Sequence, residues 1–155
     1  MRRTILIFAI IAPFFLAGCT KTEPLNTVKV TGTVTVDGAP MGGVNVIFNP
    51  VSKDGTAAGG VTGADGVYTL TSGANTPGTG AMEGSFIPTF SKTETEQREP
   101  TASPEEEIAK YGSDPPKVIY LIPQKYGNVK TCGMESVTVV KGKKNHFEFT
   151  LSTKE

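Results

Sequence analysis

Few side chains in this 155-residue chain could take part in covalent or metal chemistry, and most of them stand alone. The single histidine, His146, lies on the outward phase of an alternating segment, with no second histidine or cysteine close by in the sequence. Zinc needs several such ligands at short spacing, so we interpret His146 as an exposed surface imidazole. Cys132 also lacks a neighbouring base or metal ligand, and we interpret it as a small buried or half-buried apolar group rather than a reactive thiol.

The carboxylates offer no better arrangement for catalysis. Asp37, Asp54 and Asp65 each precede a glycine, and their spacing matches no calcium loop with alternating oxygen ligands, so we interpret them as turn residues. The acidic run 105–107 stands at the predicted start of a helix, where carboxylates complement the helix dipole and remain solvated. Hydrolysis requires a nucleophile with a base, or a metal with its ligands. We therefore expect no catalytic residues, no cofactor and no metal.

A covalent role is indicated for one residue, Cys19. Two arginines at positions 2 and 3 precede an apolar run, 4–16, that falls short of the roughly 20 residues needed to cross a bilayer. The segment Leu16-Ala17-Gly18-Cys19 resembles the bacterial lipobox, which implies removal of a signal peptide, 1–18, and lipid on the Cys19 thiol. The alternative is an ordinary signal peptide with a chance cysteine near its cleavage site. The lipobox implies a lipid-anchored protein of the cell envelope, on the extracytoplasmic side of a membrane.

The charge balance argues against nucleic acid as a partner. Removal of residues 1–18 leaves 13 basic residues against 15 acidic ones, a net charge of −2. Nucleic-acid binding draws much of its affinity from basic side chains that neutralise phosphates. We expect contact with a membrane through the lipid, and an envelope protein or a glycan is the candidate for a further partner.

Alternating residues and turn signals predict a chain built mainly of strands. In residues 28–36 valines alternate with polar residues, and Asp37-Gly38 is expected to turn this strand into an antiparallel partner at 44–48. The glycine-rich stretch 55–63 is interpreted as a connection, and it leads to a strand at 67–71.

The second half of the chain continues the pattern. Residues 85–90 could form a strand, which Pro88 would confine to an edge or a bulge. The apolar run 118–122 is suited to a buried strand, and segments 135–140 and 145–151 are expected to form a terminal hairpin. In that hairpin Phe147, Phe149 and Leu151 should face inward. Together these segments predict an all-β fold, an antiparallel β-sandwich of about seven strands with one short helix.

Several turn and core residues resemble those of a known family. They form the pattern Gly32-x-Val34-x-x-Asp37-Gly38-x-Pro40-x-x-x-Val44-x-Val46-x-Phe48, followed by Thr62-x-x-Asp65-Gly66-x-Tyr68-x-Leu70. The pattern is similar to the carboxypeptidase regulatory-like domain, and the resemblance implies a transthyretin-like fold. Residues 122–127, Thr131 and the closing strands are similar to small exported lipoproteins of planctomycete-type bacteria. The polar residues before Val28 predict a tether at 19–27, and the resemblance extends over one domain at 28–152. The sequence lacks the zinc ligands of a metallopeptidase.

Residues 91–116 are polar and acidic, and we interpret them as a surface insertion in this domain. Within it Ser103-Pro104-Glu105-Glu106 has the form of a capping box, which predicts a helix of about two turns that ends at Gly112. Ile108 and Tyr111 share one face of that helix and are expected to dock on the sandwich. We predict that the insertion, with Glu105, Glu106, Ile108, Tyr111 and the neighbouring loop 75–84, forms a recognition surface; the alternative is a tolerated decorative insertion.

Three functions remain open from the sequence. The first is a non-catalytic binding or structural module of the cell envelope. The second is an accessory or carrier subunit of an exported enzyme or transporter. The third, a free-standing enzyme such as a transthyretin-like hydrolase, requires histidines that the sequence lacks.

Overall fold

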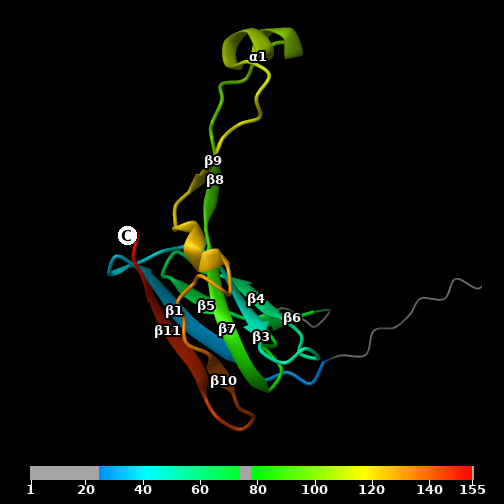
Figure 1. Cartoon of the computed structure of the whole chain (residues 1–155), viewed down its shortest axis with the longest axis vertical. Helices are drawn as coiled ribbons and strands as arrows, with labels where there is room; N and C mark the ends of the chain where they lie inside the picture. The colour runs from blue at the N-terminus through cyan, green and yellow to red at the C-terminus, as the bar shows by residue number, and fades with distance from the viewer. Residues whose placement is uncertain (1–24, 74–77, 155) are drawn as a thin grey trace, which may run out of the picture.

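The computed structural model of the chain describes residues 25–73 and 78–154, and its elements are arranged as in Figure 1. In chain order they are β1 (Val30–Val36), β2 (Ala39–Pro40), β3 (Asn45–Pro50), β4 (Ala58–Val61), β5 (Val67–Thr69), β6 (Thr71–Ser72), β7 (Gly84–Ser91), β8 (Thr93–Thr95), α1 (Pro104–Tyr111), β9 (Val118–Tyr120), the 3-10 turn η1 (Gln124–Gly127), β10 (Val137–Val139) and β11 (Asn145–Leu151). The predicted lipidation residue, Cys19, lies outside the described residues.

Two sheets pack face to face and form an all-β, sandwich-like fold. In the first sheet β1 is the central strand, with β11 along one side and β2 and β5 along the other. The second sheet has the order β10-β7-β3-β4-β6. A separate two-stranded ribbon is formed by β8 and β9. The described part contains a single α-helix, α1. A β-sandwich with one short helix is the predicted fold class, and this prediction is confirmed.

The first strand follows its predicted alternation. Along β1 each valine or glycine of one phase is fully or largely buried, while the threonines between them are half-buried. Asp37 and Gly38 both have positive φ, at 50° and 85°, as the predicted turn requires. The prediction that this turn leads to an antiparallel partner at 44–48 is wrong, because β1 pairs with the short β2 instead. Both edges of β1 are occupied by β11, β2 and β5, so β3 can pair only in the other sheet.

The prediction that segments 135–140 and 145–151 form a terminal hairpin is also wrong. β10 pairs with β7 in the second sheet, whereas β11 runs parallel to β1 in the first, from Val30 opposite Asn145 to Val36 opposite Leu151. The loop between β10 and β11 therefore crosses from one sheet to the other. This placement lets the inward residues of β11 lie beside the inward residues of β1, so that both strands bury the same face.

Two further segments of the second sheet differ from expectation. The glycine-rich connection contains a strand, β4, which pairs with β3 and β6. The strand with Pro88, β7, is central rather than an edge, since it pairs with β3 and β10. Its pairing with β10 ends at Phe86, so Pro88 lies where β7 has only β3 beside it. A proline is tolerated there because no second ladder needs its missing N–H group.

The core is organised around Phe48, which is completely buried. Its ring centroid lies 5.8 to 6.3 Å from those of four other aromatic rings, Tyr68, Phe86, Phe147 and Phe149. The predicted inward phase of β11 is confirmed, although Phe147 and Phe149 are only half-buried. The Tyr68 hydroxyl donates to the Phe147 carbonyl at 3.1 Å, and burial raises the pKa of Tyr68. Gly32 leaves room for this contact, since a Cβ there would lie 1.8 Å from the same carbonyl oxygen.

Candidate functional site

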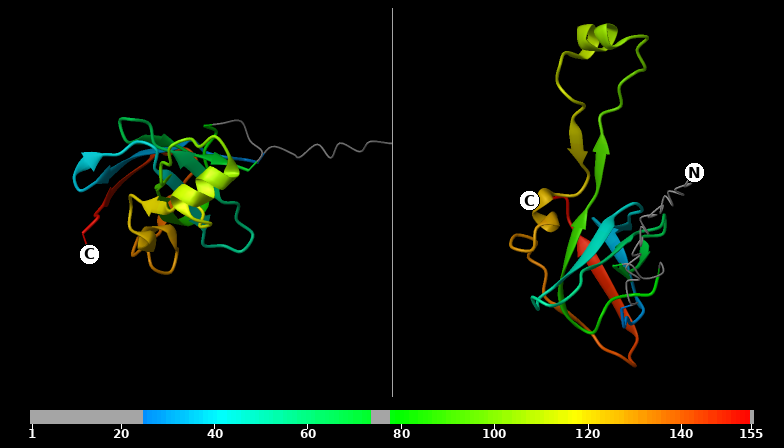
Figure 2. Two further views of the ribbon diagram at one scale, coloured as in Figure 1. Left: turned by 90° about the horizontal axis from the view of Figure 1, so that it is seen from above. Right: turned by 90° about the vertical axis from the view of Figure 1, so that its right-hand side faces the viewer.

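The predicted insertion forms an arm that projects away from the sandwich (Figures 1 and 2). We define the arm as residues 92–121. The stem is the ribbon of β8 and β9, in which Thr93 lies opposite Tyr120 and Thr95 opposite Val118. Backbone hydrogen bonds extend the ribbon at both ends, from Leu121 N–H to the Lys92 carbonyl at 2.9 Å and from Glu96 N–H to the Lys117 carbonyl at 2.7 Å. Because β7 ends directly before β8, the sheet of the sandwich positions the stem.

The stem displays apolar side chains to solvent. Val118, Ile119 and Tyr120 are 54%, 47% and 51% exposed, so the prediction of a buried strand over 118–122 is wrong except for Ile122, which is 1% exposed. The physical reason is architectural, because a two-stranded ribbon without a facing sheet has no layer against which to bury a side chain. The sequence carried one signal for this arrangement. Both ends of an insertion must meet in space, so the strands that flank it, at 91 and 118, were candidates for pairing with each other.

The predicted helix is present with its predicted caps. The Ser103 hydroxyl accepts a hydrogen bond from Glu106 N–H at 3.2 Å, and the helix ends at Gly112, whose N–H donates to the Ile108 carbonyl. The Glu106 carboxylate reaches back to Ala102 N–H at 2.9 Å, one residue earlier than the usual capping box. Glu105 and Glu106 are both exposed at the outer end of the arm.

Ile108 and Tyr111 do not dock on the sandwich, and that prediction is wrong. Ile108 is 55% exposed, because the stem holds the whole helix away from both sheets (Figure 2). Tyr111 instead packs within the arm, where its hydroxyl accepts from Glu99 N–H at 2.9 Å and the Arg98 guanidinium lies 5.0 Å from its ring centroid. These contacts join the end of the helix to the segment that precedes it, so the candidate binding residues lie on an ordered element of the arm.

An ion pair and a hydrogen bond link the two sides of the arm, residues 98–99 before the helix and residues 110 and 114 at its end. The Lys110 Nζ lies 2.5 Å from the Glu99 carboxylate, and that hydrogen bond raises the pKa of Lys110. Arg98 pairs with Glu96 at 3.5 Å and donates to the Asp114 carbonyl at 3.0 Å. Over residues 92–117 the arm carries seven carboxylates against four basic side chains, so it is a net acidic element.

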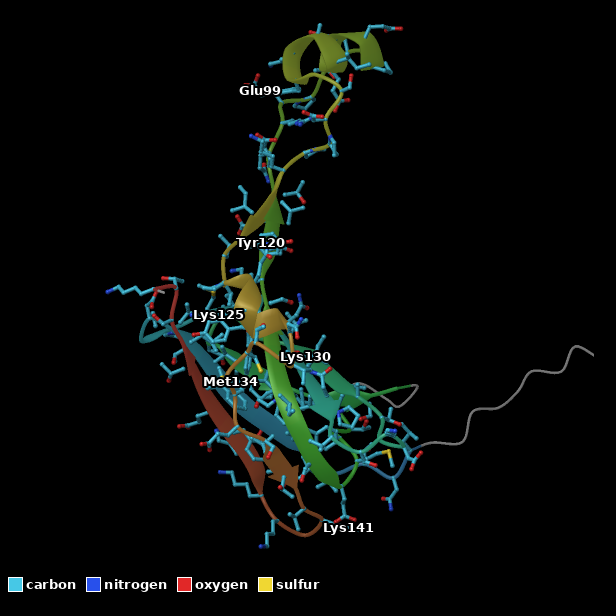
Figure 3. All side chains as sticks on the ribbon, viewed as in Figure 1. Glu99, Tyr120, Lys125, Lys130, Met134 and Lys141 are labelled. Carbon is cyan, nitrogen blue, oxygen red and sulfur yellow. The ribbon has the colours of Figure 1, made fainter. Side chains whose placement is uncertain are left out.

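A small cavity of about 200 Å³ lies where the arm joins the sandwich. It is bounded by the end of β7, by the stem and by η1; Figure 3 places Tyr120 above Lys125 and Lys130 in this region. The lining residues are Phe90, Ser91, Tyr120, Ile122, Pro123, Gln124, Gly127 and Asn128. The Tyr126 hydroxyl accepts from Ser152 N–H at 3.2 Å and so ties η1 to the end of β11. The base of the arm is therefore braced by both sheets.

Cys132 and His146 have the burial that was predicted for them. Cys132 is 4% exposed and is a free thiol whose Sγ lies 3.5 Å from the Val129 carbonyl. His146 is exposed, 3.1 Å from the Thr31 hydroxyl through Nδ1 and 3.6 Å from Glu148 through Nε2. Within residues 25–73 and 78–154 no group of three or more His, Cys, Asp or Glu side chains could hold a metal ion. In the same ranges no helix is long and apolar enough to span a membrane.

Comparison with known proteins identified no relative of this chain. No family model, no curated protein and no solved structure matches the chain.

Proposed function

We propose that this chain is an exported lipoprotein, anchored through lipid on Cys19, whose sandwich is a non-catalytic support for the arm. On this proposal the arm is the contact surface for another protein of the cell envelope. The predicted carboxypeptidase regulatory-like relationship agrees with the proposal, since it implies a binding or structural module rather than an active site.

One observation carries the proposal, the exposure of apolar side chains on both faces of a braced ribbon. Val118, Ile119 and Tyr120 are each about half exposed. Because side chains alternate along a strand, Val118 and Tyr120 share one face of β9 and Ile119 lies on the other. Exposed apolar patches rimmed by polar groups are typical of protein interaction sites. The rim is present here, because ion pairs of Arg98 and Lys110 lie just beyond the stem.

The stem also offers backbone groups. Among the described residues β8 and β9 pair only with each other, so each has one edge with free N–H and C=O groups. An exposed edge of this kind binds an extended segment of a partner by adding a strand. Apolar side chains and free backbone edges on the same ribbon favour a protein as the partner over a glycan.

Site-specific photocrosslinking in intact cells tests the proposal. A benzophenone amino acid is placed at Ile119 on the stem or at Ile47 on the outer face of β3, which are 47% and 41% exposed. We expect one adduct of defined mass from position 119 and none from position 47, and we expect the amino-terminal peptide to carry acyl chains on Cys19. Cys19→Ser should leave an uncut precursor without the adduct.

Two results would contradict the proposal. An adduct of equal yield from both positions would mean that the arm is not the contact surface. A mature chain that is cut elsewhere and carries no lipid would contradict the proposed anchoring at Cys19. The proposal that the arm is the contact surface would then be tested by the crosslink alone.

A further inference from the structure

The end of the sandwich opposite the arm carries a second cavity, of about 350 Å³, with a basic lining. Lys29, Lys143 and Lys144 line it together with Val28, Thr31 and Asn145. The three lysines are exposed, and among the described residues none has a carboxylate within ion-pair distance. Lys141 lies at the same end of the molecule (Figure 3). This end is therefore a concave surface on which three lysines lie without an ion-pair partner.

The loop that supplies two of these lysines is held in place by its neighbours. The buried Asn145 side chain donates to the carbonyls of Val140 and Lys143 at 3.0 and 3.1 Å, and accepts from Val140 N–H at 3.0 Å. Lys141 N–H donates to the Glu83 carboxylate at 2.7 Å, which fastens the loop to the start of β7. Since Asn145 is also opposite Val30 in the sheet, the loop lysines are fixed beside Lys29.

The amino-terminal side of the described chain enters the sandwich at this same end. Val28 lines the cavity and exchanges two backbone hydrogen bonds with Ala81, of 2.7 and 3.0 Å. Val28 lies only nine positions after Cys19 in the sequence. An extended chain spans at most about 3.3 to 3.6 Å per residue, so lipid on Cys19 would hold this end within about 30 Å of the membrane surface.

We infer that the lysine-lined cavity binds phosphate groups of anionic phospholipids in the membrane that holds the anchor. The inference rests on the proposed anchoring at Cys19. Lysines attract an anionic surface only within roughly a Debye length, about 8 Å at physiological ionic strength, and a tether that reaches at most about 30 Å keeps them close enough to enter that range. The acidic arm is repelled by the same surface, so binding at the lysine end points the arm away from the membrane.

Chemical footprinting of the anchored protein tests this surface. The processed chain is reconstituted in vesicles of phosphatidylcholine alone or in an equimolar mixture with phosphatidylglycerol, and lysine acylation by a neutral reagent is followed by mass spectrometry. We expect acylation of Lys29, Lys143 and Lys144, and of Lys141 at the same end, to slow about fivefold or more in the anionic vesicles, and to recover in about 1 M salt. Lys117, Lys125 and Lys130, on the arm and at its base, are internal controls and should react equally in both vesicles.

A pair of matched variants separates a specific surface from net charge. K29Q/K143Q/K144Q should abolish the protection of Lys141, whereas K117Q/K125Q/K130Q, with the same loss of charge, should retain it. Equal protection in neutral vesicles, protection of the control lysines, or protection by inorganic phosphate with neutral vesicles would overturn the inference. Failure of the anchoring proposal is read separately, as the absence of acyl chains from the amino-terminal peptide in the same mass spectra.

Discussion

The sandwich and the arm both contain strands with apolar side chains, but the sandwich buries these side chains and the arm exposes them. Val44 and Val46 on one side of the sandwich are completely buried, whereas Val118 and Ile119 on the stem are about half exposed. Each stands in or next to a β-strand with paired neighbours. The difference is the opposing layer, because the sheet of β1 and β11 faces Val44 and Val46, whereas no sheet faces the stem. Burial of a strand is thus a property of the layer opposite it rather than of the strand itself.

The two regions also differ in what holds them together. The sandwich is stabilised by a continuous apolar core, in which Phe48 contacts rings from both sheets. The arm has no buried residue in β8, α1 or β9 and depends on backbone pairing, helix caps and ion pairs. Interactions of the second kind contribute about 1 kcal/mol each or less, so the arm can adapt to a partner while the sandwich remains folded.

Truncation of the core should show the largest contrast. Phe48→Ala removes a fully buried ring and should cost about 3 to 5 kcal/mol of unfolding free energy, while Ile119→Ala on the stem should cost less than about 0.5 kcal/mol. Urea denaturation followed by circular dichroism measures both. Similar losses from the two variants would mean that the stem is part of the cooperative core.

Loss of the helix cap should have a smaller and local effect. Ser103→Ala removes the hydroxyl that accepts from Glu106 N–H and should destabilise α1 by about 1 kcal/mol. Since the helix is held within the arm, amide hydrogen exchange over 104–111 should accelerate about fivefold while the urea midpoint of the whole protein stays unchanged. Ser113→Ala, just beyond the helix, is the matched control. A shifted urea midpoint of the whole protein would mean that the arm and the sandwich unfold together, and it would contradict the separate stabilisation of the two regions.

The smallest effect concerns the carboxyl of Asp37, which holds the end of the chain. Hydrogen bonds from the Thr153 hydroxyl and N–H, with one from Ser152, lower the pKa of Asp37 below its ordinary value of 3.8. Because the folded pKa is the lower one, this contribution is present above about pH 4 and is lost as the pH falls through the folded value. A carboxyl NMR titration should show the lowered pKa, and Thr153→Ala should raise it towards 3.8.

Asp37→Asn provides the control for that titration. Asparagine tolerates the positive φ of the turn, so the variant should keep the turn. The protection of the Thr153 amide hydrogen, relative to its intrinsic exchange rate, should then no longer change with pH near the pKa of Asp37. If the titration of Asp37 were insensitive to Thr153→Ala, the hydrogen bonds to the tail would not be the cause of the lowered pKa.

Much of the local structure of the candidate site was predictable. Ser103, Glu106 and Gly112 interact within a few residues of one another, so the helix and its caps could be predicted from the residue types alone. The position of that helix could not. Ile108 and Tyr111 form an apolar face that could pack on a sheet, but the residue pattern does not show how far the helix lies from a sheet. In the structure Tyr111 contacts Glu99 and Arg98 within the arm instead.

The sequence by itself determined the strands, turns and inward phases, because alternation along 28–36 and 145–151 and the glycine of the Asp37-Gly38 turn act over a few residues. Only the tertiary structure decided which strands pair. It joins Val30 to Asn145, 115 residues later, in a parallel ladder, and it leaves 118–120 in solvent. An apolar strand fits against any sheet that faces it, so its partner and its burial depend on the positions of all the others.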